Sequence, residues 1–169
     1  MLRLAEQSRP KRVERRTPSF VLALVMFCSL SLLYVSNISR WSFDVDEIYT
    51  LHDSSQSISQ ILGYEKPLYY LICHLLLSVG FSDEWAIRLP AALSAALVAP
   101  TIYLLLWTRR DSRWAILAAV LLMGSPWLFQ LSQFGRFYAT VVLFSAIAVG
   151  CLVRCLRGSS IGWWIGSFV

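Results

Sequence analysis

The chain alternates between long apolar runs and short polar segments. Four runs of 16 to 19 residues contain no Asp, Glu, Lys or Arg, and they cover residues 20–35, 89–107, 114–131 and 137–153. With their flanks, these runs approach the roughly 20 residues that an α-helix needs to cross a bilayer. The pattern predicts an all-α, polytopic membrane protein, with one transmembrane helix in residues 19–36 and three more in residues 88–157.

A shorter apolar run covers residues 68–81, where 14 residues include no Asp, Glu, Lys or Arg. This length is typical of an interfacial helix rather than a span. Cytoplasmic loops are rich in Lys and Arg, and basic clusters lie at 3–16, 109–113 and 154–157. All three clusters reach the cytoplasm only if the run 68–81 does not cross the membrane. We therefore predict a cytoplasmic N-terminus and an external loop, residues 37–87, that contains juxtamembrane helices.

The two ends complete the predicted organisation. Residues 1–18 are expected to form a basic cytoplasmic tail, and the run after them to be retained as a signal anchor. Residues 158–169 include a nine-residue apolar run that is under half a span. We expect them to be the start of a truncated next helix.

Composition supports the membrane assignment and excludes other classes. Hydrophobic residues make up 57% of the chain and charged residues 15%, against about 45–50% and about 25% in soluble domains. The formal net charge of +5 does not indicate nucleic-acid binding, because the basic residues lie in short clusters between apolar runs. The four cysteines form no CxxC pair and are expected to be buried free thiols.

The external loop is the acidic region of the chain. Asp44, Asp46 and Glu47 fall within four residues, shortly after the first apolar run. Carboxylates at a membrane face are costly unless solvent, a cation or a reacting group uses them. They can act as general bases or hold a divalent cation.

Cationic side chains reach the same membrane surface in the predicted topology. They are Lys66, Arg88 at the head of an apolar run, and Arg136, which lies beside Tyr138. Lys and Arg near the headgroup level can bind a phosphate. Carboxylates together with phosphate-binding cations suit a substrate whose lipid tail stays in the membrane.

Four segments carry a resemblance to a known family. They read SFDVDEIY, EKPLYY, AIRLPA and SQFGRFYA, in residues 42–49, 65–70, 86–91 and 132–139. In this order they resemble the N-terminal half of the dolichyl-phosphate-mannose-protein mannosyltransferase-like family. That family includes bacterial enzymes that move sugars from polyprenyl phosphate, such as the lipid A aminoarabinose transferases. The resemblance implies the N-terminal helical module of a C-type glycosyltransferase, and because full members have many more spans, the chain is expected to be a fragment.

The resemblance also implies roles for individual residues. Asp46 and Glu47 match the family's Asp-Glu pair, with Asp46 as the base or acceptor-orienting carboxylate and Glu47 as its support. Lys66 matches the lysine that contacts the lipid phosphate in aminoarabinose transferases. Arg88 matches an arginine that lies near the active site of protein mannosyltransferases, and we expect it to bind the donor phosphate with Lys66.

Further positions of the predicted site follow from the same comparison. Arg136 and Tyr138 match the family's Ser-Gln…Arg…Tyr segment, so Arg136 is expected to help bind the donor phosphate and Tyr138 to be accessory. Asp44 is a second accessory residue, at a position where members more often carry an uncharged residue. Asp44 and Asp46 mimic the metal-binding Asp-x-Asp of other glycosyltransferases, but that spacing is common by chance. We expect no cofactor and no metal site, and a divalent cation at Asp44 and Asp46 is the alternative.

These observations predict a membrane glycosyltransferase, or the N-terminal part of one. It would transfer a sugar from a polyprenyl-phosphate-linked donor to a lipid, glycan or protein acceptor, on the extracytoplasmic face of a bacterial inner membrane. The alternative is an inactive truncated remnant, or a small membrane subunit that acts through a partner. A transporter segment, in which Asp46 and Glu47 bind a coupling cation, is disfavoured because every Asp and Glu lies outside the apolar runs.

Overall fold

The computed structural model describes residues 19–107 and 112–156, which form helices joined by short turns. In chain order the helices are α1 (Phe20–Val35), the 3-10 helix η1 (Ile38–Arg40), α2 (Val45–Ser54), α3 (Ile58–Ile61), α4 (Pro67–Ser78), α5 (Asp83–Leu106), α6 (Arg113–Met123), α7 (Pro126–Gln133) and α8 (Tyr138–Leu156). Within these ranges no strand occurs, and three helices are long and apolar enough to cross a membrane. The predicted all-α, polytopic membrane fold is confirmed. The segments predicted as a basic tail, 1–18, and as a truncated helix, 158–169, lie outside the described residues.

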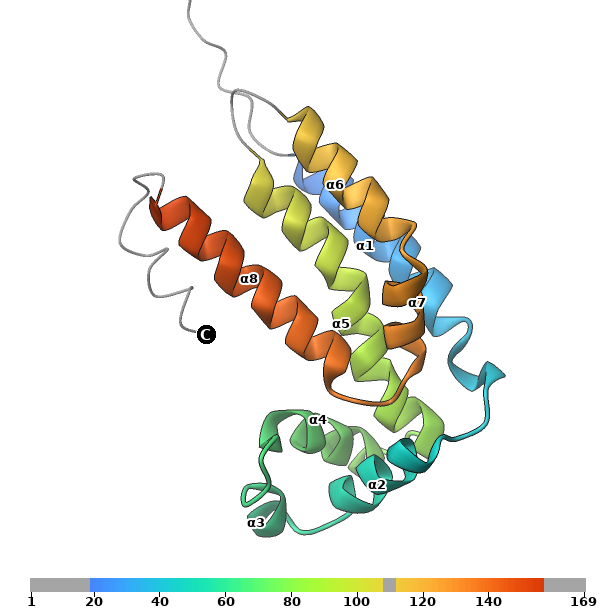
Figure 1. The fold of residues 1–169 in the computed structure, drawn as a ribbon. Coiled ribbons are helices and arrows are strands. Elements are labelled where there is room, and N and C mark those ends of the chain that lie inside the picture. Colours follow the sequence, from blue (N-terminus) through green and yellow to red (C-terminus); the bar gives the residue numbers. More distant parts are fainter. Residues whose placement is uncertain (1–18, 108–111, 157–169) are drawn as a thin grey trace, which may run out of the picture.

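The chain divides into a helical body, formed by α1 and α5–α8, and a short-helix lobe, formed by α2–α4 (Figure 1). Helix α1 runs toward the lobe, α5 leaves it, α6 and α7 return, and α8 leaves again (Figure 1). The starts of α1 and α6 and the ends of α5 and α8 therefore lie at the end of the body away from the lobe. Arg113 and Arg154, which border two of the basic clusters, belong to that end.

Helix α5 is the centre of the body, because it packs against α1, α6, α7 and α8. Its buried face consists largely of alanines that are fully buried: Ala86, Ala91, Ala92, Ala95, Ala96 and Ala99. Small side chains let neighbouring helices approach closely, which is how helices pack where lipid replaces water as the solvent. The larger apolar side chains of the surrounding helices, such as Leu24 and Leu121, point outward and are exposed.

The apolar run 114–131 is not one straight helix. It is divided between α6 and α7, which meet at an angle of 54°. Pro126 has no N–H to continue the ladder of α6, and it occupies the first turn of α7, where its missing donor costs nothing. The Ser125 hydroxyl accepts a hydrogen bond from the Leu128 N–H at 3.3 Å and caps the new helix.

The short-helix lobe is built from helices that are too short to cross a bilayer. Helix α4 spans 12 residues and begins with Pro67 in its first turn. The His74 ring donates from Nδ1 to the Ser54 carbonyl at 2.8 Å, which joins α4 to the end of α2. The Tyr69 hydroxyl donates to the Ile87 carbonyl at 2.6 Å, which attaches α4 to the start of α5.

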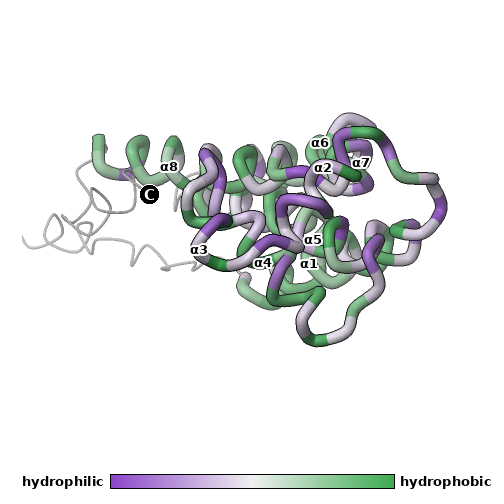
Figure 2. Tube along the Cα trace, turned by 90° about the horizontal axis from the view of Figure 1, so that it is seen from below, coloured by the Kyte–Doolittle hydropathy of each residue, from purple (hydrophilic) through white to green (hydrophobic). Residues whose placement is uncertain are grey.

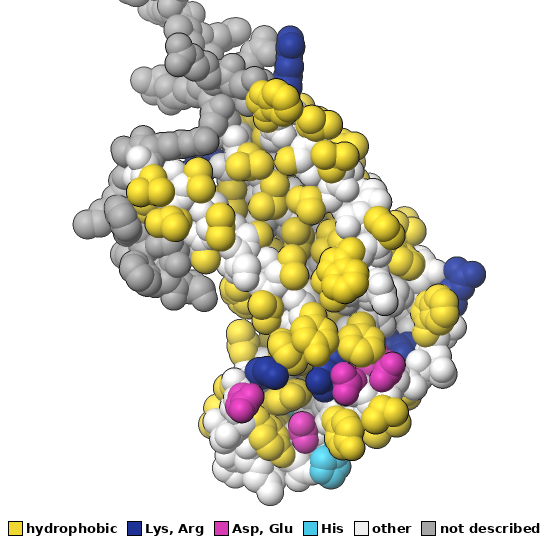
Figure 3. All heavy atoms as spheres, viewed as in Figure 1, with side chains coloured by type: hydrophobic (Ala, Val, Ile, Leu, Met, Phe, Trp, Pro, Cys, Tyr) yellow, Lys and Arg dark blue, Asp and Glu magenta, His cyan; other side chains and the backbone are white. Residues whose placement is uncertain are grey.

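Polarity follows this division of the chain. Seen from the lobe side, hydrophilic positions gather along α2–α4, whereas α8 is mostly hydrophobic (Figure 2). On the face shown in Figure 3, the body is covered mostly by hydrophobic side chains, and most of the acidic and basic groups gather where the body meets the lobe. The acidic side chains on this face thus lie at one end of an apolar bundle, whereas Arg113 and Arg154 belong to the other end.

Candidate functional site

Three segments that are distant in sequence meet at the junction of the body and the lobe. They are the first turn of α2, the first half of α5, and the turn between α7 and α8. All three belong to the motifs from which the site was predicted, and the structure brings them into hydrogen-bond contact.

The first turn of α2 is a capping box. The Asp44 carboxylate accepts from the Asp46 N–H at 3.2 Å, and the Glu47 carboxylate accepts from the Asp44 N–H at 3.1 Å. Such reciprocal bonds satisfy backbone donors that the helix leaves free at its start. The acidic cluster therefore has a structural role in beginning α2, and it also fixes where the three carboxylates lie.

Glu47 is buried and forms an ion pair with Arg88. Only 1% of each residue is exposed, and the guanidinium donates from Nε and Nη2 to the two carboxylate oxygens at 2.7 and 2.6 Å. A bidentate pair of this kind is among the strongest side-chain contacts in proteins. It joins α2 to α5 and leaves Glu47 with little access to solvent.

Arg88 uses all five of its N–H donors inside the protein. Besides Glu47, Nη1 donates to the carbonyls of Ile38 and Trp41 at 2.7 and 2.8 Å, and Nη2 donates to the Ser42 carbonyl at 3.1 Å. A guanidinium has five donors in a fixed planar arrangement. In the described conformation none is left for a phosphate, and the side chain instead holds the segment between α1 and α2.

Gly135 completes the surroundings of Glu47 and was not among the predicted residues. Its N–H donates to Glu47 Oε1 at 2.6 Å. A Cβ at this position would lie 2.8 Å from the same oxygen and 2.9 Å from Ile87 Cγ1. The position therefore requires a residue without a side chain. A glycine directly before Arg136 is visible in the sequence and could have indicated a close contact there. The sequence contains no pattern that would identify Glu47 as the partner.

Asp46 faces the other way and remains accessible. Its side chain is 47% exposed and lies 3.6 Å from Nη2 of Arg136, whose own side chain is 18% exposed. Arg136 Nη1 also donates to the Asp46 carbonyl at 3.0 Å. Two adjacent acidic residues thus have different environments, a buried and saturated one for Glu47 and an open one for Asp46.

Lys66 and Arg136 both lie close to one aromatic ring. The Lys66 ammonium is 4.0 Å from the centroid of the Phe137 ring, and the Arg136 guanidinium carbon is 5.8 Å from it. The same carbon lies 5.9 Å from the centroid of the Tyr138 ring. Lys66 is exposed, and cations near an aromatic face are attracted by its negative centre. The structure therefore brings Asp46, Arg136, Lys66 and Tyr138 together as the accessible part of the site.

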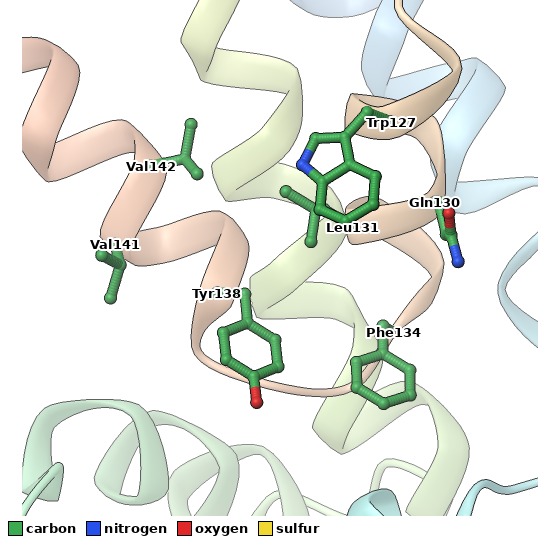
Figure 4. A pocket seen from close by; sticks show the side chains of 7 residues that line it. All are labelled: Trp127, Gln130, Leu131, Phe134, Tyr138, Val141 and Val142. Atoms are coloured by element: carbon green, nitrogen blue, oxygen red, sulfur yellow. The ribbon is translucent and has the colours of Figure 1, made fainter.

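An apolar groove of about 490 Å³ runs between α7 and α8 toward this site (Figure 4). It is lined by Trp127, Gln130, Leu131, Phe134, Tyr138, Val141 and Val142. Trp127 and Val141 are more than half exposed, so the groove is open at the side of the body. Tyr138 and Phe134 lie at its lobe end (Figure 4), where the two rings stack with centroids 6.2 Å apart.

A second cavity, of about 550 Å³, lies beyond Phe134. It is lined by Trp41, Ser42, Phe43, Asp44, Glu47, Arg88, Phe129, Gln130, Gln133 and Phe134. Gln130 and Phe134 line both hollows, so the apolar groove and the more polar cavity share a wall. Together they combine an apolar path along the body with polar groups at its end.

Burial raises the pKa of two side chains of α4, Tyr69 and Cys73. Burial raises the pKa of the Cys73 thiol to about 12, and it raises the pKa of the Tyr69 phenol well above its usual value. Both groups are therefore neutral at physiological pH and belong to the packing of α4 against α5. The four cysteines, all in the described part of the chain, are free thiols. Three of them are buried as predicted, but Cys28 is exposed on the outer face of α1.

The carboxylates of Asp44, Asp46 and Glu47 lie beside donor groups of the protein itself. Within residues 19–107 and 112–156, no three His, Cys, Asp or Glu side chains lie close enough together to hold an ion. Asp44 Oδ1 is bonded to a backbone N–H, whereas the Asp46 carboxylate lies beside a guanidinium. Neither His52 nor His74 joins them, since His52 is close to Gln56 and His74 is bonded to the Ser54 carbonyl.

The fold and the site define a polytopic membrane protein with a mixed acidic and basic site at one end of its helical body. A sequence profile of the family described as dolichyl-phosphate-mannose-protein mannosyltransferase matches residues 65–169. The match covers more than half of the 169 residues, and the chain belongs to this family. The matched range includes Lys66, Arg88 and Arg136. No curated protein and no solved structure matches the chain.

Proposed function

We propose that the chain works as a membrane glycosyltransferase that uses a polyprenyl-phosphate-linked sugar. The observation that carries the proposal is the position of the lobe end of the apolar groove. The groove ends at Tyr138 and Phe134, next to Arg136, and the exposed Asp46 lies within 3.6 Å of that arginine. The groove would hold the lipid tail of the donor, and Arg136 would contact its phosphate. Asp46 would then lie where the reacting hydroxyl of the acceptor arrives.

In this proposal the acceptor hydroxyl attacks the anomeric carbon while the bond from that carbon to the phosphate oxygen breaks. The electron pair of the broken bond leaves with the polyprenyl phosphate, and Asp46 takes the hydroxyl proton. Arg136 and Lys66 stabilise the charge that develops on the leaving phosphate. Direct displacement inverts the anomeric configuration.

Glu47 and Arg88 have a supporting role in this proposal. Their pair fixes the first turn of α2 against α5, and Gly135 joins the turn before Arg136 to the same carboxylate. Asp46 and Arg136 are thereby held on two segments that share one anchor. Arg88 was predicted to bind the donor phosphate, and because its donors are occupied we now propose that it positions the site.

We further propose that the site faces the extracytoplasmic side of a bacterial inner membrane. Arg113 and Arg154, which border two of the basic clusters, lie at the end of the body away from the lobe, and positive loops favour the cytoplasm. The acidic lobe would then lie outside, where the lipid-linked donor and its acceptor meet.

The test compares the wild-type chain with Asp46→Asn in liposomes. Each receives a panel of undecaprenyl-phosphate-linked monosaccharides together with extracted envelope lipids and glycans, and the release of undecaprenyl phosphate is measured. Loss of a general base lowers rates by about 10²- to 10⁴-fold, so we expect a loss in that range. Asp83→Asn, an exposed acidic residue in the first turn of α5, is the matched control and should retain activity.

Unchanged release by Asp46→Asn would refute the role of Asp46. No release by the wild-type chain with any member of the panel would contradict the enzymatic proposal for this chain. Because the Asp46 side chain is half exposed and its contact with Arg136 is long, the substitution is not expected to unfold the protein.

A further inference from the structure

The cavity beyond Phe134 has an aromatic wall that the proposed reaction does not use. Four rings line it, those of Trp41, Phe43, Phe129 and Phe134. Trp41 is 62% exposed although it is large and apolar. The cavity volume of about 550 Å³ falls in the range of about 300–1,000 Å³ that small-molecule sites occupy. Sites of this kind combine apolar walls with a few polar groups that fix the orientation of the ligand.

The ion pair in the cavity wall contributes no free hydrogen-bonding group. Arg88 has all five donors in use, and the Glu47 carboxylate accepts from Arg88, Gly135 and Asp44. The two charges also cancel one another. The ligand-binding chemistry of the cavity therefore depends on the remaining polar residues, of which Asp44 carries the only uncompensated charge among the lining residues.

Asp44 has acceptor capacity to spare. One of its oxygens, Oδ1, accepts from the Asp46 N–H, and no ion pair involves Asp44 in the part of the chain that the structure describes. A carboxylate has about four acceptor positions, so hydroxyl groups of a ligand can still donate to it. Gln133, on the same wall, is 9% exposed, and its Oε1 is buried without a hydrogen-bond partner. An unpaired buried acceptor costs free energy, which a donor from a ligand would recover by reaching Oε1. Reaching it requires a shift of the amide, whose Nε2 donates to the Tyr34 carbonyl at 3.1 Å.

From this combination we propose that the cavity is a monosaccharide subsite and that Asp44 recognises the hydroxyl groups of the sugar. The apolar face of a pyranose ring would pack on the aromatic wall, and its hydroxyls would donate to Asp44 and Gln133. The proposal rests on the proposed glycosyltransferase function, because the shared wall of Gln130 and Phe134 joins this cavity to the groove assigned to the lipid. The single uncompensated charge is negative, so the subsite favours neutral sugars over uronates.

The alternative is that Asp44 acts only as the cap of α2. The substitution Asp44→Ser separates the two roles, because serine caps a helix about as well as aspartate but has no charge and a shorter reach. Trp41→Leu tests the aromatic wall. The matched controls are Asp83→Ser, in the first turn of α5, and Tyr49→Leu, an exposed aromatic residue of α2 that lies outside the cavity.

The experiment is saturation-transfer NMR on the full chain in lipid nanodiscs. The probes are methyl α-D-mannopyranoside, methyl β-D-glucopyranoside and methyl β-D-glucuronide. We expect the neutral glycosides to bind more tightly than the glucuronide. Asp44→Ser and Trp41→Leu should each raise the Kd for the neutral glycosides by about five-fold or more, which corresponds to about 1 kcal/mol. Asp44→Ser should also reduce the discrimination against the glucuronide, whereas the controls should bind like the wild type.

Absence of saturation transfer to any probe would overturn the proposal. So would an unchanged Kd and unchanged discrimination in Asp44→Ser, since a residue that only caps α2 predicts that result. The source of the sugar follows from kinetics. An increased KM for the lipid-linked donor assigns the subsite to the donor sugar, an increased KM for the acceptor assigns it to an acceptor glycan, and a change in neither overturns it.

The two proposals fail in different ways. Transfer that stops in Asp46→Asn but is unaffected in Asp44→Ser would remove the subsite and leave the glycosyltransferase function. Binding of the neutral glycosides that depends on Asp44, in a chain that releases no undecaprenyl phosphate, would remove the enzymatic function and leave a sugar-binding cavity.

Discussion

Replacing Arg88 by Met tests whether the buried ion pair holds the junction together. The substitution removes five hydrogen bonds, two to Glu47 and three to the carbonyls of Ile38, Trp41 and Ser42. Glu47 would keep only two backbone donors while remaining buried. Removing one partner of a buried pair typically costs about 3–5 kcal/mol. We expect a loss of unfolding free energy within that range.

Two further variants test whether the lost ion pair causes the loss of unfolding free energy in Arg88→Met. Arg88→Lys keeps the charge but has three donors in place of five, so we expect about half of the loss, roughly 2 kcal/mol. Adding Glu47→Gln to Arg88→Met removes the uncompensated charge. The double variant should therefore lose less than the sum of the single variants, with a coupling of about 1–3 kcal/mol.

The assay is reversible unfolding in mixed micelles with increasing denaturing detergent, followed by the loss of helical circular dichroism. Arg40→Met is the matched control, because Arg40 is exposed and, among the described residues, its side chain makes one hydrogen bond, to Asn37, at 3.4 Å. It should stay within about 0.5 kcal/mol of the wild type. The reasoning would be refuted by an Arg88→Met variant as stable as the control, or by additive losses in the double variant.

Three other outcomes follow from the same structure. Gly135→Ala places a Cβ 2.8 Å from Glu47 Oε1, so it should lower the unfolding free energy by about 1–3 kcal/mol. The same assay measures this loss, and unchanged stability would contradict the close approach. The pKa of about 12 at Cys73 keeps its thiol protonated, so mass spectrometry should find no alkylation by iodoacetamide at pH 8 until the protein is denatured; rapid alkylation of the folded form would refute its burial. A cysteine at Ser78 should react with an impermeant maleimide on intact cells and one at Ser112 only after permeabilisation; labelling of the Ser112 variant from outside would reverse the proposed orientation.

The fold class followed from the sequence because membrane helices depend on a simple property, the length of an apolar run. The runs at 20–35, 89–107 and 137–153 correspond to α1, α5 and α8. The division of the run 114–131 was missed, although Pro126 marks it, because apolar content alone does not distinguish a straight helix from a bent one. The resemblance supplied the family, which the match to residues 65–169 confirms.

The structure brings several of the residues predicted for the site close together, but their contacts could not be predicted from the sequence. Asp46 and Glu47 are adjacent in sequence and were expected to act as a pair. The first turn of α2 turns one toward Arg136 and the other toward Arg88. Helical geometry places neighbouring side chains about 100° apart, but which of the two is buried depends on where α5 lies. Gly135 was missed for the same reason, since its role exists only once the turn after α7 packs against Glu47.

The buried carboxylate of Glu47 also sets an order for biosynthesis. Residue 47 is synthesised before any of its side-chain or tertiary donors, and Arg88 follows 41 residues later and Gly135 after 88. Until α5 has been synthesised, the Glu47 carboxylate and the carbonyls of Ile38, Trp41 and Ser42 lack the guanidinium that binds them. Arg88 can then bind the segment between α1 and α2 through three backbone carbonyls. Gly135, in the turn between α7 and α8, adds the last donor to Glu47. The full set of contacts around Glu47, and with it the pairing of Asp46 with Arg136, can therefore form only after the turn between α7 and α8 has been synthesised.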